Sequence, residues 1–195
     1  GAGGKTLAIG AAMRNTGRLY AFDTSAHRLD ALKPRLARSG LSNVHPAAIA
    51  HERDERIKRL AGKIDRVLID APCSGLGTLR RNPDLKWRQS PASVQEMAVL
   101  QLAILQSAAR LLKPGGRLVY ATCSILPIEN EAVAQAFLEQ NSDFLPLDAG
   151  EILSDLKVES LVTLCSGGAE NTRYLRLWPH LHHTDGFFAA IWQKN

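Results

Sequence analysis

The order of hydrophobic and polar positions predicts strands and helices that alternate along most of the chain. Short runs rich in β-branched and aliphatic residues are typical of buried strands, and longer segments with an apolar residue every three or four positions are typical of helices. Strands are predicted at 17–23, 43–45, 64–70 and 117–122. Helices are predicted at 5–13, 25–40, 95–112 and 129–140. This alternation indicates an α/β fold in which a mostly parallel sheet is covered on both faces.

Local signals set several boundaries within this pattern. Ser25 is the predicted N-cap of helix 25–40, Gly40 is its expected end, and Pro34 should kink it or move its boundary. The apolar stripe of helix 95–112 consists of Val99, Leu102, Leu105 and Ala109. Its expected stop is Lys113-Pro114-Gly115-Gly116. The charged segment 51–60 is predicted to be a surface turn or helix, and the basic segment 76–93 a loop.

The pattern weakens in the last quarter of the chain. Residues 158–168 are expected to be irregular. Two further strands, 174–178 and 187–192, flank a polar, histidine-rich turn and should form an antiparallel pair at the edge of the sheet.

Composition limits the function without changing the predicted fold. With 195 residues, 45% of them hydrophobic, the chain is long enough for one domain with a substantial core. Its formal net charge of +5 suits a polyanionic partner. No apolar run reaches the roughly 18 residues that span a bilayer, and no charged and then apolar leader opens the sequence. We therefore expect no membrane partner and a cytoplasmic location.

Residues suited to chemistry stand where the predicted strands end, which is where open parallel sheets bind their ligands. They are the Gly1-Ala2-Gly3-Gly4-Lys5-Thr6 loop, Asp23, Asp70, Cys73 and Cys123. A glycine loop at a helix start exposes backbone N–H groups to a ligand, and an acid after the next strand can accept both hydroxyls of a ribose. Two alternatives stay open here. Asp23 could cap the following helix, and the loop could end a phosphate-binding P-loop with Asp70 as the magnesium ligand.

The two cysteines at strand ends are the sharpest signal. The chain has three cysteines and no CxxC pair, which disfavours a disulfide framework or a zinc knuckle and fits a reducing compartment. Cys73 and Cys123 each follow a strand and precede a serine, so their thiols could meet in one pocket. A disulfide oxidoreductase or a metal site then has to be considered. A metal would need further ligands to converge from His51, His180, His182 and His183, whose spacing gives no motif. We predict no metal.

Five segments together resemble the Sun/Fmu branch of the RNA cytosine-5 methyltransferases. They are Gly1-Ala2-Gly3-Gly4-Lys5-Thr6, Asp70-Ala71-Pro72-Cys73-Ser74-Gly75, Arg80-Arg81-Asn82-Pro83-Asp84-Leu85-Lys86-Trp87, Tyr120-Ala121-Thr122-Cys123-Ser124 and Asp185-Gly186-Phe187-Phe188. The likeness runs in order along the chain but is absent from 147–173. It implies a Rossmann-like fold that holds S-adenosylmethionine, with 1–195 as the methyltransferase catalytic domain. Because no strand precedes the opening loop, we expect this domain to be truncated at its N-terminus and to lack an upstream RNA-binding domain.

The resemblance also assigns the cofactor contacts. Asp23 would bind the ribose hydroxyls, Arg28 would assist at the edge of the cofactor, and Asp70 would lie between cofactor and base. The residues expected around the methionine and ribose are Gly1, Ala2, Gly3, Gly4 and Lys5. Ile49 departs from the family pattern, because an acid that contacts the adenine is usual there. That contact would fall to backbone, to a neighbour such as Glu52, or to apolar packing.

The mechanism implied by the resemblance overcomes the weak nucleophilicity of cytosine carbon 5. Cys123 would add to carbon 6, carbon 5 would take the methyl group, and a base would remove the carbon 5 proton so that the thiol leaves. Asp70 would hydrogen-bond the cytosine, and Cys73 would assist product release. DNA cytosine methyltransferases use the Pro-Cys thiol as nucleophile. The Thr-Cys signature is what assigns that role here to Cys123.

A stacked base must leave its stack before a thiol can reach it, so the expected partner is single-stranded or flippable RNA, either ribosomal or transfer RNA. The expected RNA-binding residues are Arg80, Arg81, Lys86, Trp87 and Arg88. Each arginine could instead be a solvated surface residue. Two other functions stay open: a P-loop nucleotide hydrolase and a catalytically weak RNA-binding module.

Overall fold

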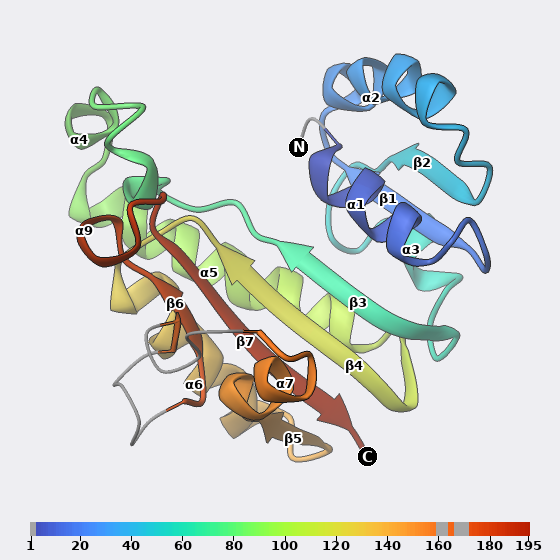
Figure 1. Cartoon of the computed structure of the whole chain (residues 1–195). Helices are drawn as coiled ribbons and strands as arrows, with labels where there is room; N and C mark the ends of the chain where they lie inside the picture. Colours follow the sequence, from blue (N-terminus) through green and yellow to red (C-terminus); the bar gives the residue numbers. More distant parts are fainter. Residues whose placement is uncertain (1–2, 159–163, 166–171) are drawn as a thin grey trace. The chain divides into compact units, whose positions relative to one another are not determined.

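The computed structural model describes residues 3–158, 164–165 and 172–195. The chain forms two compact units, Gly1–Lys58 and Arg59–Asn195. Each unit has a β-sheet of its own (Figure 1).

The first unit combines a two-stranded parallel sheet with three helices. Its elements are α1 (Gly4–Ala12), β1 (Leu19–Asp23), α2 (Ala26–Ser39), β2 (Val44–Ala48) and α3 (Glu55–Lys58). β1 and β2 are paired from Leu19 opposite Val44 to Asp23 opposite Ala48. The predicted parallel arrangement of these two strands is therefore confirmed.

Helix α2 has the caps that its sequence predicts. The Ser25 hydroxyl accepts a hydrogen bond from the Arg28 N–H at 3.4 Å. Gly40 ends the helix in the left-handed region with a φ of 70°. Pro34 lies inside the helix without ending it, so the helix keeps the bounds that the caps predict.

The second unit is built on five strands. They are β3 (Ile64–Asp70), β4 (Leu112–Thr122), β5 (Phe144–Leu147), β6 (Leu175–Leu177) and β7 (Phe187–Lys194). Their order is β3-β4-β7-β5, with β6 also paired to β7. β3 and β4 are parallel, whereas β7 runs antiparallel to β4, β5 and β6.

The antiparallel pairing of the two C-terminal strands is thus confirmed, but the expected edge position is wrong for β7. Phe188, Ala189, Ala190 and Trp192 are all buried. A strand whose neighbouring residues are buried on both faces is typical of the sheet interior, and β7 lies there between β4 and β5 (Figure 1).

Helices and short 3-10 turns connect these strands. They are η1 (Leu76–Thr78), α4 (Leu85–Arg88), α5 (Pro91–Ala109), η2 (Pro127–Glu129), α6 (Glu131–Gln140), α7 (Ala149–Asp155) and α9 (Pro179–His182). Helix α5 packs against β3 and β4. The Phe137 ring of α6 lies 4.9 Å from Trp192 and 5.2 Å from Phe144, measured between ring centroids. Burying one such side chain contributes about 1.5–3 kcal/mol, so this aromatic cluster anchors α6 to β5 and β7. Among the described helices, none is long and apolar enough to cross a membrane.

Several boundaries differ from the sequence prediction. α5 begins at Pro91 rather than at 95, because Ser90 and Ser93 form a reciprocal capping box. Val99 is 64% exposed, so it does not belong to the buried face of α5. The segment from Lys113 to Gly116, expected to end the helix, lies within β4. Leu112 already pairs with Ile64, and a bulge follows this pair.

Other differences concern whole segments. The basic segment 76–93, predicted to be a loop, contains η1 and α4. β5 and α7 were not predicted. The irregular segment expected at 158–168 lies almost wholly outside the described residues.

Candidate active site

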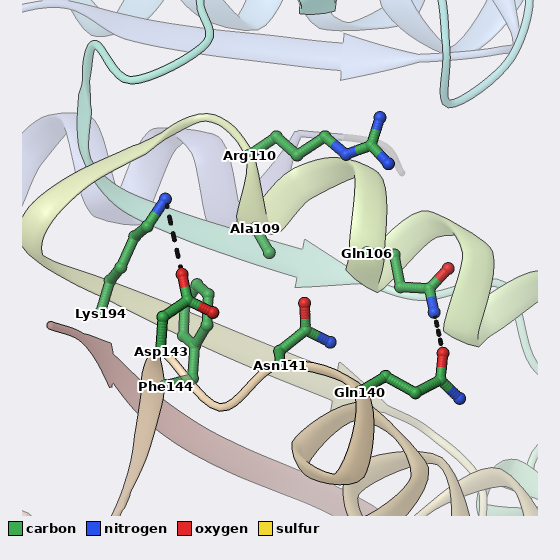
Figure 2. A pocket seen from close by; sticks show the side chains of 8 residues that line it. All are labelled: Gln106, Ala109, Arg110, Gln140, Asn141, Asp143, Phe144 and Lys194. Carbon is green, nitrogen blue, oxygen red and sulfur yellow. Dashed lines mark hydrogen bonds and ion pairs between the residues drawn. The ribbon is translucent and has the colours of Figure 1, made fainter.

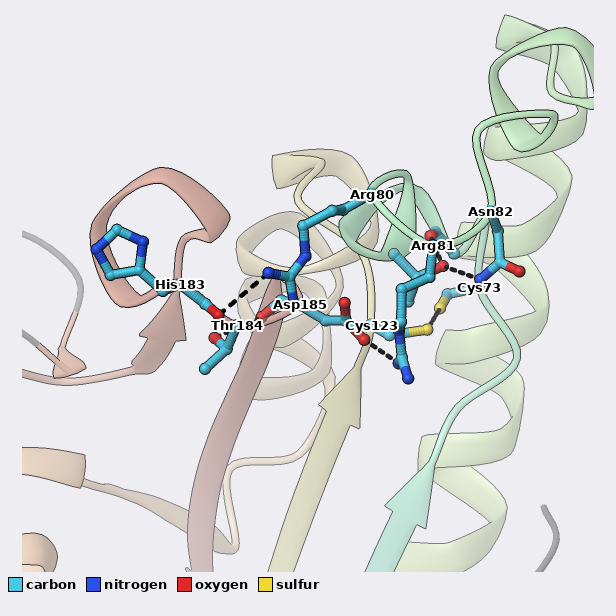
Figure 3. Close-up of polar contacts among 10 residues, drawn as sticks. Cys73, Arg80, Arg81, Asn82, Cys123, His183, Thr184 and Asp185 are labelled. Atoms are coloured by element: carbon cyan, nitrogen blue, oxygen red, sulfur yellow. Dashed lines mark hydrogen bonds and ion pairs between the residues drawn. The ribbon is translucent and has the colours of Figure 1, made fainter.

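Two cysteines meet at the ends of adjacent parallel strands. β3 and β4 are paired up to Asp70 opposite Ala121, and the chain reaches Cys73 three residues after β3 and Cys123 one residue after β4. Their sulfur atoms lie 3.4 Å apart (Figure 3). The expectation that these two thiols could meet is confirmed. Cys165 is a buried residue in an isolated bridge with Leu175.

The surroundings of the pair change the pKa of the Cys73 thiol. The hydrogen bond with Cys123, together with burial, raises the pKa of the Cys73 thiol far above its usual range. Cys73 therefore keeps its proton at neutral pH and can donate it toward the sulfur of Cys123. Asp70, the third expected catalytic residue, ends β3 and is exposed.

Two glycines connect the Cys123 loop to the segment before β7 through backbone hydrogen bonds. The Gly77 N–H donates to the Cys123 carbonyl at 2.9 Å, and the Gly186 N–H donates to the Gly77 carbonyl at 2.7 Å. A Cβ on Gly77 would lie 2.6 Å from the Cys123 carbonyl oxygen. Only glycine fits this crossing, and it brings the Asp185-Gly186-Phe187-Phe188 segment beside the cysteine loop.

Behind the cysteines lies a residue that the sequence analysis missed. Glu129 is fully buried and accepts hydrogen bonds from Ser74 and Ser124, the residues that follow the two cysteines. Gln101 also donates to this carboxylate, at 3.1 Å. The sequence carried one usable signal for this buried polar group. Gln101 lies on the buried face of α5 between Ala98 and Leu105, where an apolar residue is usual.

The expected RNA-binding residues fall into two groups. Arg80 donates to the His183 carbonyl at 3.3 Å, and Arg81 forms an ion pair with Asp185 (Figure 3). The other group belongs to α4. There the Lys86 ammonium lies 4.9 Å from the Trp87 ring centroid, and Arg88 pairs with Asp84 at 2.7 Å. Trp87 is 81% exposed, which leaves its ring face accessible to a partner.

The residues expected to hold the cofactor lie mostly in the first unit. Gly1 and Ala2 lie outside the described residues. Gly3 caps α1 with a φ of 88°, and a Cβ on it would lie 2.3 Å from Leu32. Gly4 and Lys5 form the first turn of α1, and a Cβ on Gly4 would meet no atom within 4 Å. A start of this kind, with a left-handed glycine and open space, fits a ligand that approaches the backbone.

Asp23 ends β1 and is not the cap of α2, because Ser25 has that role. The Asp23 carboxylate accepts the Ser25 N–H at 2.8 Å and lies 3.8 Å from Arg28. Its position after a strand suits the expected ribose contact. Ile49 donates its N–H to the Asp23 carbonyl at 3.1 Å, and the neighbouring Glu52 pairs with Arg53.

A polar cavity of about 270 Å³ lies elsewhere in the second unit (Figure 2). Its lining includes Gln106 of α5, Arg110, which follows α5, and Lys194 of β7. The register of β4 and β7 sets residue 193 opposite 117 and residue 188 opposite 122, so this cavity is at the opposite end of the sheet from Cys123. Within the described residues, no three His, Cys, Asp or Glu side chains group as they would around a metal ion.

Comparisons with known proteins find relatives that match almost the whole chain. The family described as 16S rRNA methyltransferase RsmB/F matches residues 1–193. The chain is 41% identical over 195 residues to a probable ribosomal RNA small subunit methyltransferase B of Synechocystis, covering 98% of this chain and 41% of the relative. It is 38% identical over 195 residues to ribosomal RNA small subunit methyltransferase F of Aeromonas salmonicida, covering 99% and 38%. The chain thus spans about two fifths of the length of these relatives.

Solved structures agree with this result. A methyltransferase homolog protein from Pyrococcus horikoshii superposes with a TM-score of 0.77 at 32% identity, covering 98% of this chain and 58% of that one. NSun6 from the same organism, determined with SFG, superposes with a TM-score of 0.79 at 29% identity, covering 98% and 45%. The Rossmann-like methyltransferase fold expected from the sequence is confirmed.

Proposed function

The chain belongs to the 16S rRNA methyltransferase RsmB/F family, and from that premise we propose that it methylates carbon 5 of a cytosine in RNA with S-adenosylmethionine as methyl donor. Ribosomal RNA is the proposed substrate, because the relatives carry that name. Transfer RNA is the alternative substrate. The cytoplasm remains the proposed compartment.

The observation that carries the proposal is the 3.4 Å approach of the Cys73 and Cys123 sulfurs at two adjacent strand ends. Family membership alone would leave the chemistry open, and two thiols alone would fit a redox site. Their combination favours a covalent methyltransferase over the P-loop hydrolase, which gives no reason for paired cysteines. It also favours the methyltransferase over a catalytically weak RNA-binding module, since RNA binding needs neither thiol.

Cys123 is the proposed nucleophile and Cys73 its helper. The pKa of the Cys73 thiol is raised by its hydrogen bond with Cys123 and by burial, so Cys73 is suited to stay protonated beside the Cys123 sulfur. The Cys123 thiolate adds to carbon 6 of cytosine and makes carbon 5 nucleophilic. Once carbon 5 is methylated, a base removes its proton and the electron pair expels the Cys123 thiolate. Cys73 can return a proton to the departing sulfur.

Asp70 and the expected cofactor-binding residues have separate proposed roles. Asp70 would hydrogen-bond the amino group and ring nitrogen of cytosine, which selects cytosine over uracil. S-adenosylmethionine supplies an electrophilic methyl group when bound, and the solved NSun6 structure with SFG supports this choice of cofactor. The start of α1 and Asp23 are the groups on this chain proposed to bind it.

The proposed RNA contacts come from exposed side chains. Arg80, Arg81, Lys86 and Arg88 would meet phosphates, and Trp87 would stack on a base. Arg81 and Arg88 already have carboxylate partners. The exposed Arg88–Asp84 pair is worth about 0–1 kcal/mol, so a phosphate can replace Asp84 at little cost.

Trapping on RNA that contains 5-fluorocytosine tests the proposal, because fluorine cannot leave as a proton does and the adduct persists. The protein is incubated with this RNA and labelled cofactor, then resolved under denaturing conditions. Cys123→Ala should abolish the adduct, whereas Cys73→Ala should retain it, and Cys165→Ala serves as the matched control. If Cys123→Ala still traps RNA and Cys73→Ala does not, the two roles are reversed. If neither the wild type nor any of the variants traps RNA, the proposed activity is wrong.

A further inference from the structure

Behind the paired cysteines lies a carboxylate that none of the proposed steps uses. Glu129 ends η2, and its side chain has no exposed surface. Carboxylates are almost never buried to this degree unless their oxygens are bonded, since desolvation of an unpaired charge is very costly. The structure must therefore supply donors to both oxygens.

Four donors surround the Glu129 carboxylate. Oε1 accepts from the Ser74 N–H at 2.7 Å and from Gln101 Nε2 at 3.1 Å. Oε2 accepts from the Ser74 hydroxyl at 2.5 Å and from the Ser124 hydroxyl. An ionised carboxylate has about four acceptor positions, so this set satisfies it completely. Hydrogen bonds to a charged acceptor are also about twice as strong as neutral ones.

Two of these donors lie one residue beyond the two sulfurs. Ser74 follows Cys73 on the loop after β3, and Ser124 follows Cys123 on the loop after β4. Their hydroxyls are 3.3 Å apart and both meet the same oxygen of Glu129. The carboxylate thus ties together two loops that lie beyond the last paired residues of their strands.

Further buried groups hold Glu129 and its partner Gln101 in place. Gln101 Nε2 also donates to the Pro72 carbonyl at 2.8 Å, on the residue before Cys73. The Tyr120 hydroxyl lies 2.6 Å from the Glu129 carbonyl and 3.0 Å from Gln101 Oε1. Gln101 and Tyr120 have no exposed surface. Gln101 of α5 and Tyr120 of β4 therefore hold Glu129 in place.

We propose that Glu129 is a positioning residue that clamps the two cysteine loops and so sets the separation of the Cys73 and Cys123 sulfurs. Its carboxylate bonds Ser74 and Ser124, and it acts on the two sulfurs through these residues. Its effect on methyl transfer rests on the proposed function. Its effect on the sulfur separation holds whatever reaction the pair performs.

Glu129→Gln tests the clamp, because it keeps the size of the side chain and removes the charge that both hydroxyls face. The substitution is made in a Cys165→Ala background, so that Cys73 and Cys123 are the remaining thiols. Bridging of these two thiols by dibromobimane, which becomes fluorescent when it joins two sulfurs, reports their separation without any substrate. Adduct formation on 5-fluorocytosine RNA reports the catalytic consequence.

We expect Glu129→Gln to slow both bridging and adduct formation by about tenfold or more, since misplacement of reacting groups by about 1 Å can cost a hundredfold. Glu131→Gln is the matched control. It removes a carboxylate two residues away that pairs with Arg176, and it should leave the bridging rate unchanged. If circular dichroism shows that Glu129→Gln is unfolded, Ser124→Ala is measured instead. This variant removes one of the hydroxyl donors to Glu129, and it should also slow bridging.

Two results separate the inference from the proposed function. Wild-type bridging and adduct rates in a folded Glu129→Gln protein, or in Ser124→Ala where that variant replaces it, would overturn the clamp while the methyltransferase stands. Slower bridging in a protein that never traps RNA would support the clamp while the proposed function fails.

Discussion

The crossing of Gly77 and Gly186 allows a prediction whose size can be worked from the structure. A Cβ on Gly77 would lie 2.5 Å from the Gly186 carbonyl oxygen and 2.6 Å from the Cys123 carbonyl oxygen. Both distances are below the 3.0 Å that Cβ atoms essentially never cross, and both atoms are backbone. No side-chain rotation can relieve the overlap, so Gly77→Ala must move one of the two loops.

The expected cost combines overlap and lost hydrogen bonds. Overpacking of this kind costs about 1–3 kcal/mol, and the bonds at 2.9 Å and 2.7 Å that join Gly77 to Cys123 and Gly186 contribute about 1 kcal/mol each. We expect Gly77→Ala to lower the free energy of unfolding by about 3–5 kcal/mol. For a chain of this length that corresponds to a fall of about 6–20 °C in the thermal midpoint. Because the Cys123 carbonyl is displaced, adduct formation should slow by about tenfold or more.

Thermal unfolding and RNA trapping on the same preparations check this prediction. Gly62→Ala is the control, because Gly62 has a φ of 65° but open space for a Cβ. It carries the left-handed strain of about 1–2 kcal/mol without any overlap, and its adduct rate should equal that of the wild type. A Gly77→Ala protein that unfolds no earlier than Gly62→Ala and traps RNA at the wild-type rate would refute the reasoning.

Three further predictions use other parts of the site. The hydrogen bond with Cys123 is the main cause of the raised pKa of Cys73, and burial is the second, so Cys123→Ala should lower that pKa toward its usual range. Alkylation of Cys73 by iodoacetamide should then begin at a lower pH than in the wild type. An unchanged pH profile of alkylation would contradict this prediction. Trp87→Ala should weaken RNA binding about tenfold, as expected for one lost stacked base, with no change in the thermal midpoint, because the ring is 81% exposed; equal affinity in a fluorescence titration would exclude stacking. Tyr120→Phe should lower the free energy of unfolding by about 1–3 kcal/mol, since it removes the donor to the Glu129 carbonyl, and urea denaturation measures that loss directly.

The sequence predicted elements whose signals are local. The run Ile64–Asp70 became β3 with unchanged bounds, and the caps Ser25 and Gly40 delimit α2 as expected. β5 was missed because its four residues include Pro146 and depend on pairing with β7. Such nonlocal pairing leaves no pattern in a short segment, and the same is true of the internal position of β7.

The candidate site divides in the same way. Strand ends placed Cys73 and Cys123 together, since carboxyl ends of adjacent parallel strands share one edge of a sheet. Glu129 could not be found by such rules, because a glutamate in a turn is usually exposed and its burial depends on Ser74 and Gln101, which are far from it in the sequence, as well as on Ser124. The assignment of nucleophile and helper came from family resemblance and stays a prediction.

The structure also connects residues that the sequence assigned to separate tasks. Arg81, expected to bind RNA, forms an ion pair with Asp185, and the next residue, Gly186, donates to Gly77, which in turn donates to the Cys123 carbonyl. This chain of contacts joins an exposed arginine to the loop of the proposed nucleophile through backbone groups with little room to move. We therefore expect a substitution at Arg81 to change the support of Cys123 as well as the charge offered to a phosphate. Reduced activity in such a variant identifies an RNA contact only if RNA affinity falls while the bridging rate of the two thiols stays unchanged.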